Sequence, residues 1–300
     1  MSTIKNFEEL IDHLRLRGDR KRVAVVWAVD EQTQMSVSQA LEVGFIDAIF
    51  VGCEKEVRSN AVLMRHHEHV TFVDAADSDE AARKAVALVR NSDADILMKG
   101  MLNTDNLLRA VLNKENGILP HGRVLTHITA AEMPAYPKLL FFTDSAVIPY
   151  PTQEQRMEQV KYITYVAHAF GIEEPKVALV HCSEKVGEKH FPFTVGYKDI
   201  IELSRDGRFG SCIIDGPIDV KTACSGENMR KKGIASPLNG EADALVFPDI
   251  EAGNMFYKTI TLFCHANTAA VLQGTLAPVV LPSRSDSKQC KFYSLALAAL

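Results

Sequence analysis

The 300-residue sequence lacks long apolar runs and has no strong excess of basic charge. No run reaches the length that spans a bilayer, about 20 apolar residues. The first ten residues carry acids and no apolar secretory segment. We therefore expect a cytoplasmic protein that does not enter membranes. The formal net charge of -5 argues against a general nucleic-acid-binding protein, which would show a basic face.

Several familiar catalytic and metal-binding motifs are also missing. The sequence contains no G-x-x-x-x-G-K-[ST], no G-x-G-x-x-G and no G-x-S-x-G. These absences argue against a P-loop NTPase, a dinucleotide dehydrogenase of the usual type and a serine hydrolase. The six cysteines form no C-x-x-C pair, and their spacings fit neither a zinc site nor a disulfide framework. The histidines of segment 66–69 have no matching ligand group, so no metal site is predicted.

Strand-like and helix-like patterns alternate along most of the chain, which is long enough for two domains. This alternation is typical of βαβ units, which build a parallel sheet with helices on both faces. A break at Pro134 and Pro137 suits a crossover between domains, because paired prolines discourage helix. The predicted strands cover residues 22–28, 47–51, 70–73, 95–98, 139–143, 176–181, 211–214, 244–247 and 278–281, and the predicted helices 31–43, 55–67, 78–90, 152–170, 197–204 and 255–265.

Two polar phrases near the end of the chain each follow a predicted strand. The phrase 248–258 follows strand 244–247, and the phrase 282–287 follows strand 278–281. Loops that leave the carboxyl ends of parallel strands are where α/β proteins bind their ligands. The two phrases together therefore predict a site for an anionic substrate.

The second phrase holds Ser283, Arg284 and Asp286. A guanidinium group can hold a phosphate in a bidentate fork, which makes Arg284 the candidate for phosphate. Ser283 can donate to a developing oxyanion or to a leaving oxygen. Asp286 could orient Arg284 or serve as a base. The alternative is a turn with a surface ion pair.

In the first phrase, Asn254 and Lys258 stand at the expected first turn of helix 255–265, about one turn apart. Gly253 would let the backbone approach a ligand closely. Exposed backbone N–H groups at a helix start favour negative charge. The alternative is an ordinary capped helix.

A further cationic group, Lys99, ends the strand 95–98. A helix is expected to begin near Thr104 and to carry Arg109. The lysine at the end of the strand would then lie opposite the start of this helix, an arrangement that suits the binding of an anion. The alternative is that Thr104 caps the helix and Arg109 is solvated.

Two other polar segments have simpler interpretations. Residues 215–217, Asp-Gly-Pro, are typical of a turn. Residues 230–232 form a basic cluster at a helix end, where a solvated face is favoured and a phosphate-rich ligand tail is the alternative.

Taken in order, these phrases resemble the phosphate acetyl/butyryltransferase family, and most closely its butyryltransferase branch. The resemblance covers most of the chain from about Asp95 onward. It is specific because many short phrases occur in the same order and at about the same spacing as in the family. The phrases that carry it are Leu97–Gly100, Ala110–Glu115, Lys138–Phe141, Pro175–Ala178, Asp215–Pro217, Lys232–Ile234, Glu241–Asp243, Pro248–Asn254, Tyr257–Lys258 and Ser283–Arg284.

The resemblance implies an α/β fold of two three-layer α/β/α domains flanking a cleft, like isocitrate/isopropylmalate dehydrogenase. The first domain would combine residues 1–133 with the returning segment 273–300, and the second would cover residues 134–272. It also implies a homodimer or a higher homo-oligomer.

The implied reaction converts a short-chain acyl-CoA, butyryl-CoA first, and phosphate into acyl phosphate and CoA. CoA is then a substrate, with no bound cofactor, metal or nucleic acid. The catalytic residues would be Ser283, Arg284 and Asp286. The implied contacts to phosphate or CoA are Lys99, Thr104, Arg109, Gly253, Asn254 and Lys258.

Two positions depart from the family pattern. Acetyl-specific members have an aspartate, the thiol's base, near the place of Cys290, and butyryl-type relatives lack it. Lys221 stands where the family usually has a second aspartate after Asp-Gly-Pro. Three alternatives stay open: an acetyltransferase-like enzyme of another chain length, a metal- or NAD-dependent dehydrogenase of the related fold, and a non-catalytic CoA-binding protein. The dehydrogenase would need an aspartate cluster around a metal, which the sequence does not display.

Overall fold

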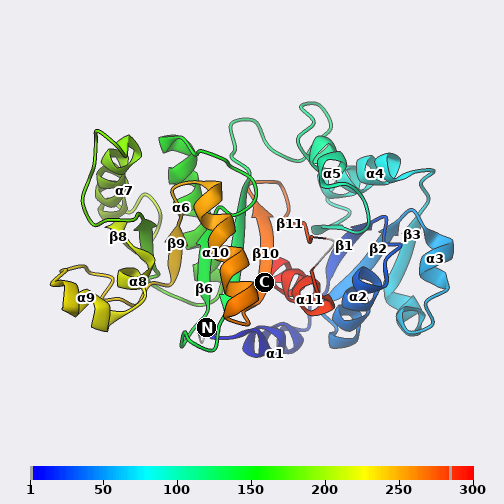
Figure 1. The fold of residues 1–300 in the computed structure, drawn as a ribbon. Helices are drawn as coiled ribbons and strands as arrows, with labels where there is room; N and C mark the ends of the chain where they lie inside the picture. The colour runs from blue at the N-terminus through cyan, green and yellow to red at the C-terminus, as the bar shows by residue number, and fades with distance from the viewer. Residues whose placement is uncertain (1–2, 284–285) are drawn as a thin grey trace. The chain divides into compact units, whose positions relative to one another are not determined.

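The computed structural model describes residues 3–283 and 286–300. Its internal contacts divide the chain into two compact units (Figure 1). The first unit comprises residues 7–125 and 267–300, and the second unit comprises residues 1–6 and 126–266. Both units combine strands with helices, which confirms the α/β class. In the described part of the chain, no helix is both long and apolar enough to cross a membrane.

Six strands of the first unit lie in the order β3-β2-β1-β4-β11-β10. Neighbouring strands run parallel except for β11 and β10, which are antiparallel. The elements of this unit are α1 (Phe7–Arg17), β1 (Lys21–Val26), α2 (Glu31–Val43), β2 (Ile46–Val51), α3 (Glu54–Arg58), η1 (Leu63–His69), β3 (Val70–Val73), α4 (Ser78–Arg90), β4 (Ile96–Lys99), α5 (Thr104–Val111), β10 (Asn267–Gln273), β11 (Val279–Val280) and α11 (Lys288–Ala299).

The helices of the first unit form two groups. Helices α1 and α2 both pack against α11, whereas α4 packs against α5. The strand order explains the separation, because the chain moves outward from β1 to β3 and then returns to β4 on the other side of β1. Right-handed crossovers in opposite directions place α2 and α4 on opposite faces of a sheet.

Five strands of the second unit lie in the order β5-β6-β9-β7-β8. The pair β5 and β6 is antiparallel, and the other neighbours are parallel. The elements are β5 (Thr126–Glu132), β6 (Leu140–Thr143), α6 (Gln153–Ala169), β7 (Lys176–Val180), η2 (Pro192–Thr194), α7 (Val195–Arg205), β8 (Ile213–Ile218), α8 (Val220–Ala223), α9 (Gly226–Lys232), β9 (Ala244–Val246) and α10 (Ile250–Phe263).

Local capping explains why the best-predicted helices form where they do. Helices α2 and α4 begin after Asp30 and Asp77, whose carboxylates accept the N–H groups of Thr33 and Glu80. Both helices have the predicted bounds. Helix α6 begins with a reciprocal capping box between Thr152 and the third helical residue.

The predicted parallel pairing holds for most neighbouring strands, but the sheet is mixed, because each unit also contains an antiparallel pair. No strand was predicted over residues 126–132, which form β5. Its pairing with β6, with Thr129 opposite Phe142, joins this segment to the second unit. The compact units therefore change after Leu125 and after Ala266, about eight and six residues before the predicted boundaries at 133 and 272.

Two predicted local structures are also wrong. The helix expected over 55–67 is divided into α3 and η1, because the side-chain oxygen of Asn60 accepts the N–H groups of Val62 and Leu63. The Asp-Gly-Pro segment 215–217 is not a turn but lies within β8. Its pairing with β7 supplies the extended partner that composition alone does not reveal.

Candidate active site

In the second unit, helix α10 is held directly against the loop that follows β6. The helix begins after Asp249, whose carboxylate accepts the N–H of Ala252. A β-carbon at Gly253 would lie 2.1 Å from the backbone oxygen of Asp144, so this position requires glycine. The side-chain amide of Asn254 donates to the backbone oxygen of Ser145 at 3.0 Å.

These contacts correct the interpretation of the first phrase. Because α10 begins at Ile250, Asn254 lies beyond the first turn and Lys258 lies a further turn along. Gly253 permits the close approach of helix to loop, and its approach to a ligand stays a prediction. Both Asn254 and Lys258 are exposed, and the Lys258 ammonium lies 4.9 Å from the ring centre of Tyr257.

The loop beneath α10 is organised by the buried carboxylate of Asp144, which is 2% exposed. One oxygen accepts the Thr126 hydroxyl at 2.8 Å and the backbone N–H groups of His127 and Ile148. The other oxygen accepts the N–H groups of Ala146 and Val147 at 2.8 and 2.9 Å. These five hydrogen bonds compensate for burial of the charge and fix the ends of β5 and β6 against each other.

A histidine and a serine lie close together where β5 begins and β6 ends. The Nδ1 atom of His127 lies 3.1 Å from the hydroxyl of Ser145 and 3.4 Å from the hydroxyl of Thr129. Because β5 is antiparallel to β6, the first residues of β5 lie beside the last residues of β6. Sequence reasoning missed Asp144 and Ser145. The rule used for the other strands, that polar residues at the carboxyl end of a strand bind ligands, would have found Asp144 and Ser145.

In the first unit, β4 and β11 are adjacent parallel strands, with Leu97 opposite Val279 and Met98 opposite Val280. Lys99 is the last residue of β4, and Ser283 comes three residues after β11, so both belong to the carboxyl ends of adjacent parallel strands. Lys99 is 2% exposed, and its ammonium donates to the backbone oxygens of Gly100 and Leu102, both at 3.2 Å. These two hydrogen bonds hold the Nζ atom of Lys99 in one position at the carboxyl end of β4.

Two described residues of the second phrase, Ser283 and Asp286, contact each other. The backbone N–H of Ser283 donates to the Asp286 carboxylate at 2.7 Å, and the N–H of Asp286 donates to the Ser283 backbone oxygen at 3.2 Å. Ser287 then caps α11 by accepting the N–H of Cys290. Arg284, the predicted phosphate ligand, lies outside the described residues. The Asp286 carboxylate thus supports the Ser283 backbone, a role the sequence did not suggest.

Cys290 is a half-buried residue on the first turn of α11. Burial and the nearby Asp286 carboxylate raise its pKa to about 11, and its sulfur lies 3.5 Å from the Thr268 hydroxyl. Only about 0.1% of such a thiol is ionised at pH 8. Cys290 therefore does not replace the missing aspartate as a base at neutral pH.

This environment predicts that Cys290 reacts slowly with iodoacetamide at pH 8, whereas the exposed Cys182 is alkylated first. Mass spectrometry of peptides after brief labelling measures both rates, and labelling in urea provides the unfolded control. Alkylation of Cys290 as fast as Cys182 in the folded protein would contradict the buried, protonated thiol.

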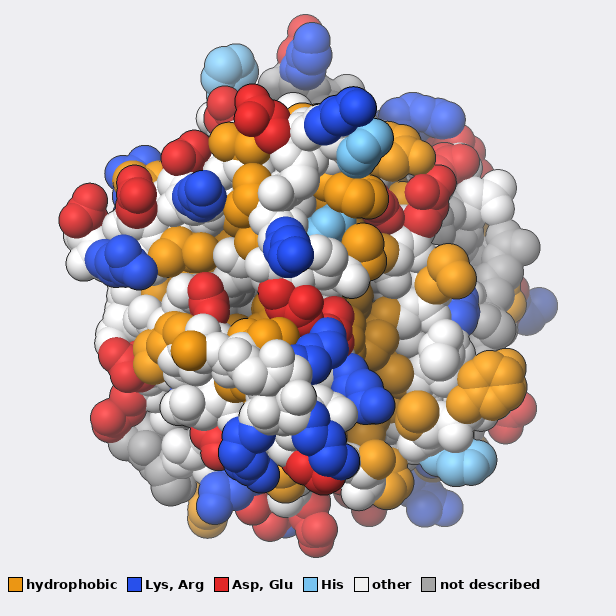
Figure 2. Space-filling view, turned by 60° about the vertical axis from the view of Figure 1, so that its left-hand side comes forward, with side chains coloured by type: hydrophobic (Ala, Val, Ile, Leu, Met, Phe, Trp, Pro, Cys, Tyr) orange, Lys and Arg blue, Asp and Glu red, His pale blue; other side chains and the backbone are white. Residues whose placement is uncertain are grey.

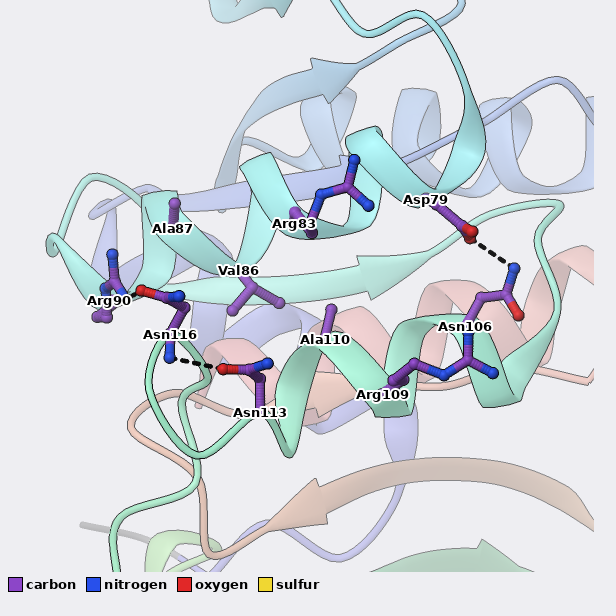
Figure 3. Close-up of a pocket in the computed structure, with 10 residues that line it drawn as sticks. All are labelled: Asp79, Arg83, Val86, Ala87, Arg90, Asn106, Arg109, Ala110, Asn113 and Asn116. Carbon is purple, nitrogen blue, oxygen red and sulfur yellow. Dashed lines mark hydrogen bonds between the residues drawn. The ribbon is translucent and has the colours of Figure 1, made fainter.

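Arg109 lines a groove of about 360 Å³ between α4 and α5, within the first unit (Figure 3). Arg83 and Arg90 of α4 line the same groove. Arg90 donates to the Asn116 side chain at 2.8 Å, and in the described part of the chain none of the three guanidinium groups forms an ion pair. Asp79 also lines the groove, but the three arginines give it a net positive charge, which suits an anion. Thr104 is exposed at the start of α5, where Asn103, rather than Thr104, occupies the cap position.

The basic cluster at residues 230–232 has acidic partners. Lys232 pairs with Glu184 at 2.7 Å and with Asp219, and Lys231 pairs with Glu227 at 2.5 Å. Lys232 and hydrogen bonds from Thr222 lower the pKa of Asp219, despite the opposing effect of burial. Figure 2, turned toward the side that bears α7 to α9, shows basic and acidic side chains next to one another. These pairs favour a solvated, charge-balanced surface over a phosphate-binding one.

Within residues 3–283 and 286–300, no group of three or more histidine, cysteine or acidic side chains could hold a metal ion. The histidine-rich segment 66–69 lies in η1, and the ring of His69 contacts the Asp47 carboxylate at 2.8 Å. This contact gives the segment a structural role where β2 and β3 begin.

Comparison with known proteins gives consistent matches over the whole chain. Residues 60–299 match the family described as phosphate acetyl/butaryl transferase. The chain is 39% identical to phosphate butyryltransferase of Clostridium acetobutylicum, over 99% of this chain and 98% of that protein. It is 34% identical to phosphate acetyltransferase of Thermotoga maritima, over 98% of both chains. A branched-chain phosphotransacylase from Enterococcus faecalis superposes with a TM-score of 0.82 at 31% identity, covering 93% of this chain and 97% of that one.

Proposed function

The chain belongs to the phosphate acetyl/butaryl transferase family and is an acyltransferase, and we propose that its substrates are butyryl-CoA and phosphate. The reaction would produce butyryl phosphate and CoA. The observation that carries the proposal is the position of Lys99 and Ser283 at the ends of adjacent parallel strands. Two phrases far apart in the sequence thereby provide a cation and a hydroxyl at one sheet edge, as an anionic substrate requires.

The proposed mechanism follows the movement of charge. A phosphate oxygen attacks the thioester carbonyl carbon, a tetrahedral oxyanion forms, and the C–S bond then breaks to release the CoA thiolate. We assign Arg284 to the phosphate and Ser283 to the oxyanion or leaving oxygen. Lys99 would offset the negative charge of both substrates from its fixed position.

The remaining sequence assignments stay proposals. Asn254 and Lys258, both exposed on α10, would contact phosphate or CoA, and Gly253 would hold α10 in place for them. Arg109 and the cationic groove of the first unit would attract the phosphates of CoA, with Thr104 at the start of the same helix. CoA would act as a substrate, without a bound cofactor.

We also propose the arrangement implied by the sequence, in which two α/β domains flank a cleft as in isocitrate/isopropylmalate dehydrogenase. The return of residues 267–300 to the first unit supports it. A homodimer or higher homo-oligomer is supported by α10, whose side chains Met255, Leu262 and Phe263 are 70%, 69% and 73% exposed. Apolar exposure of this extent on one helix is typical of an interaction surface.

The preferred length of the acyl chain is tested by measuring CoA release from acetyl-, propionyl-, butyryl- and branched-chain acyl-CoA with phosphate present. We expect the highest kcat/KM with a four-carbon chain. Each methylene contributes about 1–3 kcal/mol of discrimination, so neighbouring chain lengths are expected to react more slowly but measurably. A maximum with acetyl-CoA would reject the butyryl assignment while keeping the acyltransferase reaction.

A further inference from the structure

A lysine and an aspartate of the first unit form a largely buried ion pair that the proposed mechanism does not use. The ammonium of Lys291 donates to one carboxylate oxygen of Asp30 at 3.1 Å and to the hydroxyl oxygen of Thr33 at 3.2 Å. Lys291 is 4% exposed, and Thr33 is fully buried. A buried pair of this kind gains little stability over apolar residues of the same size, because both charges lose their hydration. The geometry that the pair fixes is therefore a better explanation for it than stability.

Lys291 lies at the start of α11, the helix that directly follows the second phrase. Its backbone N–H donates to the backbone oxygen of Ser287, the residue that caps α11, at 3.1 Å. The neighbouring Asp286 accepts the N–H of Ser283 with its carboxylate at 2.7 Å. A short series of contacts thus leads from Lys291 through Ser287 and Asp286 to Ser283.

The partners of Lys291 lie at the start of α2, in the same unit. Asp30 caps this helix by accepting the N–H of Thr33 at 2.8 Å. A further contact joins the two helix starts, because the N–H of Lys288 donates to the side-chain oxygen of Gln32 at 3.1 Å. Helices α2 and α11 pack together (Figure 1). The first turn of α11 therefore has a fixed position on α2.

The connection that leads from β1 to α2 also supports the strand end that carries Lys99. The N–H of Gly100 donates to the backbone oxygen of Val26 at 2.8 Å, and the N–H of Met101 donates to that of Trp27 at 2.9 Å. A β-carbon at Gly100 would lie 2.5 Å from the Val26 oxygen, so this contact requires glycine. One connection of the chain thus supports both Lys99 and the start of α11.

We propose that Lys291 and Asp30 are positioning residues, which hold the start of α11 and the adjoining Ser283 in one place relative to Lys99. The inference rests on the proposed function, in which Ser283 and Lys99 act on the same anionic substrates. In this role neither member of the pair contacts a substrate. A displacement of about 1 Å caused by a distant substitution can lower turnover about 10²-fold, so a pair that prevents it matters for kcat.

The carboxylate of Asp30 depends on Lys291 for its counter-charge. Burial raises the pKa of Asp30, but hydrogen bonds from Thr33 and the charge of Lys291 outweigh this effect and lower the pKa below its ordinary value. Among the residues that the structure describes, Lys291 is the only cation paired with Asp30, and the second carboxylate oxygen is buried without a hydrogen-bond partner. Removal of Lys291 alone would leave this charge uncompensated, so a single variant loses stability as well as positioning.

The test separates these two effects with Lys291→Met and the double variant Lys291→Met/Asp30→Asn. Asparagine keeps the cap of α2, and the double variant has no unpaired buried charge. We expect the urea midpoint to fall in Lys291→Met and to recover largely in the double variant. In contrast, kcat for CoA release from butyryl-CoA and phosphate should stay about 10²-fold below wild type in both, because both lack the tie between α11 and α2.

Hydrogen exchange provides a measurement of positioning that needs no turnover. The N–H groups of Ser283, Asp286 and Cys290 are all hydrogen-bonded near the start of α11. In the double variant, amides of segment 283–291 should exchange faster than in wild type, although global stability has recovered. Unchanged exchange in this segment would overturn the inference.

Arg22→Met is the matched control, because Arg22 pairs with Asp95 at 2.8 Å where β1 and β4 begin, at the opposite ends of these strands. It should keep the wild-type kcat and the exchange of segment 283–291. A double variant whose kcat recovers together with its stability would overturn the inference and leave the proposed function standing. An equal loss of kcat in Arg22→Met would also overturn it. An inactive wild-type protein would reject the proposed function and this inference together.

Discussion

Replacing Asp144 with alanine is expected to lower the free energy of unfolding of the second unit by about 3–5 kcal/mol. The substitution removes the acceptor of five hydrogen bonds at a site that is 2% exposed. The Thr126 hydroxyl and four backbone N–H groups would lose their partner, and each unsatisfied buried donor costs about 1–3 kcal/mol before water and local movement compensate. The loop that supports α10 should therefore loosen.

The measurement is urea unfolding followed by far-ultraviolet circular dichroism, which reports on both units. The single tryptophan, Trp27, lies in the first unit and would report mainly on that unit. Asp77→Ala is the control, because Asp77 also accepts a backbone N–H but is exposed at the start of α4. Loss of this cap should cost about 1 kcal/mol. An Asp144 variant no less stable than the Asp77 variant would refute the organising role of the buried carboxylate.

Arg284→Ala is expected to lower kcat for CoA release in the presence of phosphate by at least about 10²-fold, the scale of one lost electrostatic contact to the transition state. Arg284 lies outside the described residues, so the expectation rests on its place after Ser283 at the end of β11. Arg284→Lys keeps the charge but loses the bidentate fork, so it should recover only part of the rate. Steady-state kinetics with varied phosphate distinguish binding from turnover.

The control is Arg15→Ala, an exposed arginine of α1 whose partner is Asp12 at 2.7 Å. It should leave the kinetics unchanged, since surface pairs of this kind contribute little. Circular dichroism checks that each variant is folded. Unchanged kinetics in Arg284→Ala would remove the phosphate assignment.

The parts of the fold that sequence predicted best are those fixed by local interactions. Helices α2 and α4 were predicted with the observed bounds because apolar periodicity and aspartate caps agree at Asp30 and Asp77. The start of α10 was missed because Asp249 was interpreted as part of a ligand loop, although it caps the helix. The strands β5 and β8 depend on pairing with β6 and β7, which a local pattern does not reveal.

The residues of the candidate site also fall into two groups, those that a local pattern predicts and those whose contacts depend on distant parts of the chain. Lys99 and Ser283 were predicted at the ends of strands 95–98 and 278–281, and the parallel pairing of β4 with β11 explains why they share an edge. Asp144 and His127 were not predicted as a pair, because their contact requires an antiparallel return of the chain across the segment between β5 and β6. The requirement for glycine at position 253 depends on the backbone of Asp144, 109 residues earlier.

The central claim is that phosphate is the acyl acceptor, and one measurement tests it most directly. The wild-type protein is incubated with butyryl-CoA, with phosphate or with sulfate at equal ionic strength, and both free CoA and acyl phosphate are quantified. We predict that phosphate alone supports CoA release, with one acyl phosphate formed for each thiol. CoA release that is equal in sulfate, or no phosphate-dependent release from any short-chain acyl-CoA, would contradict the claim.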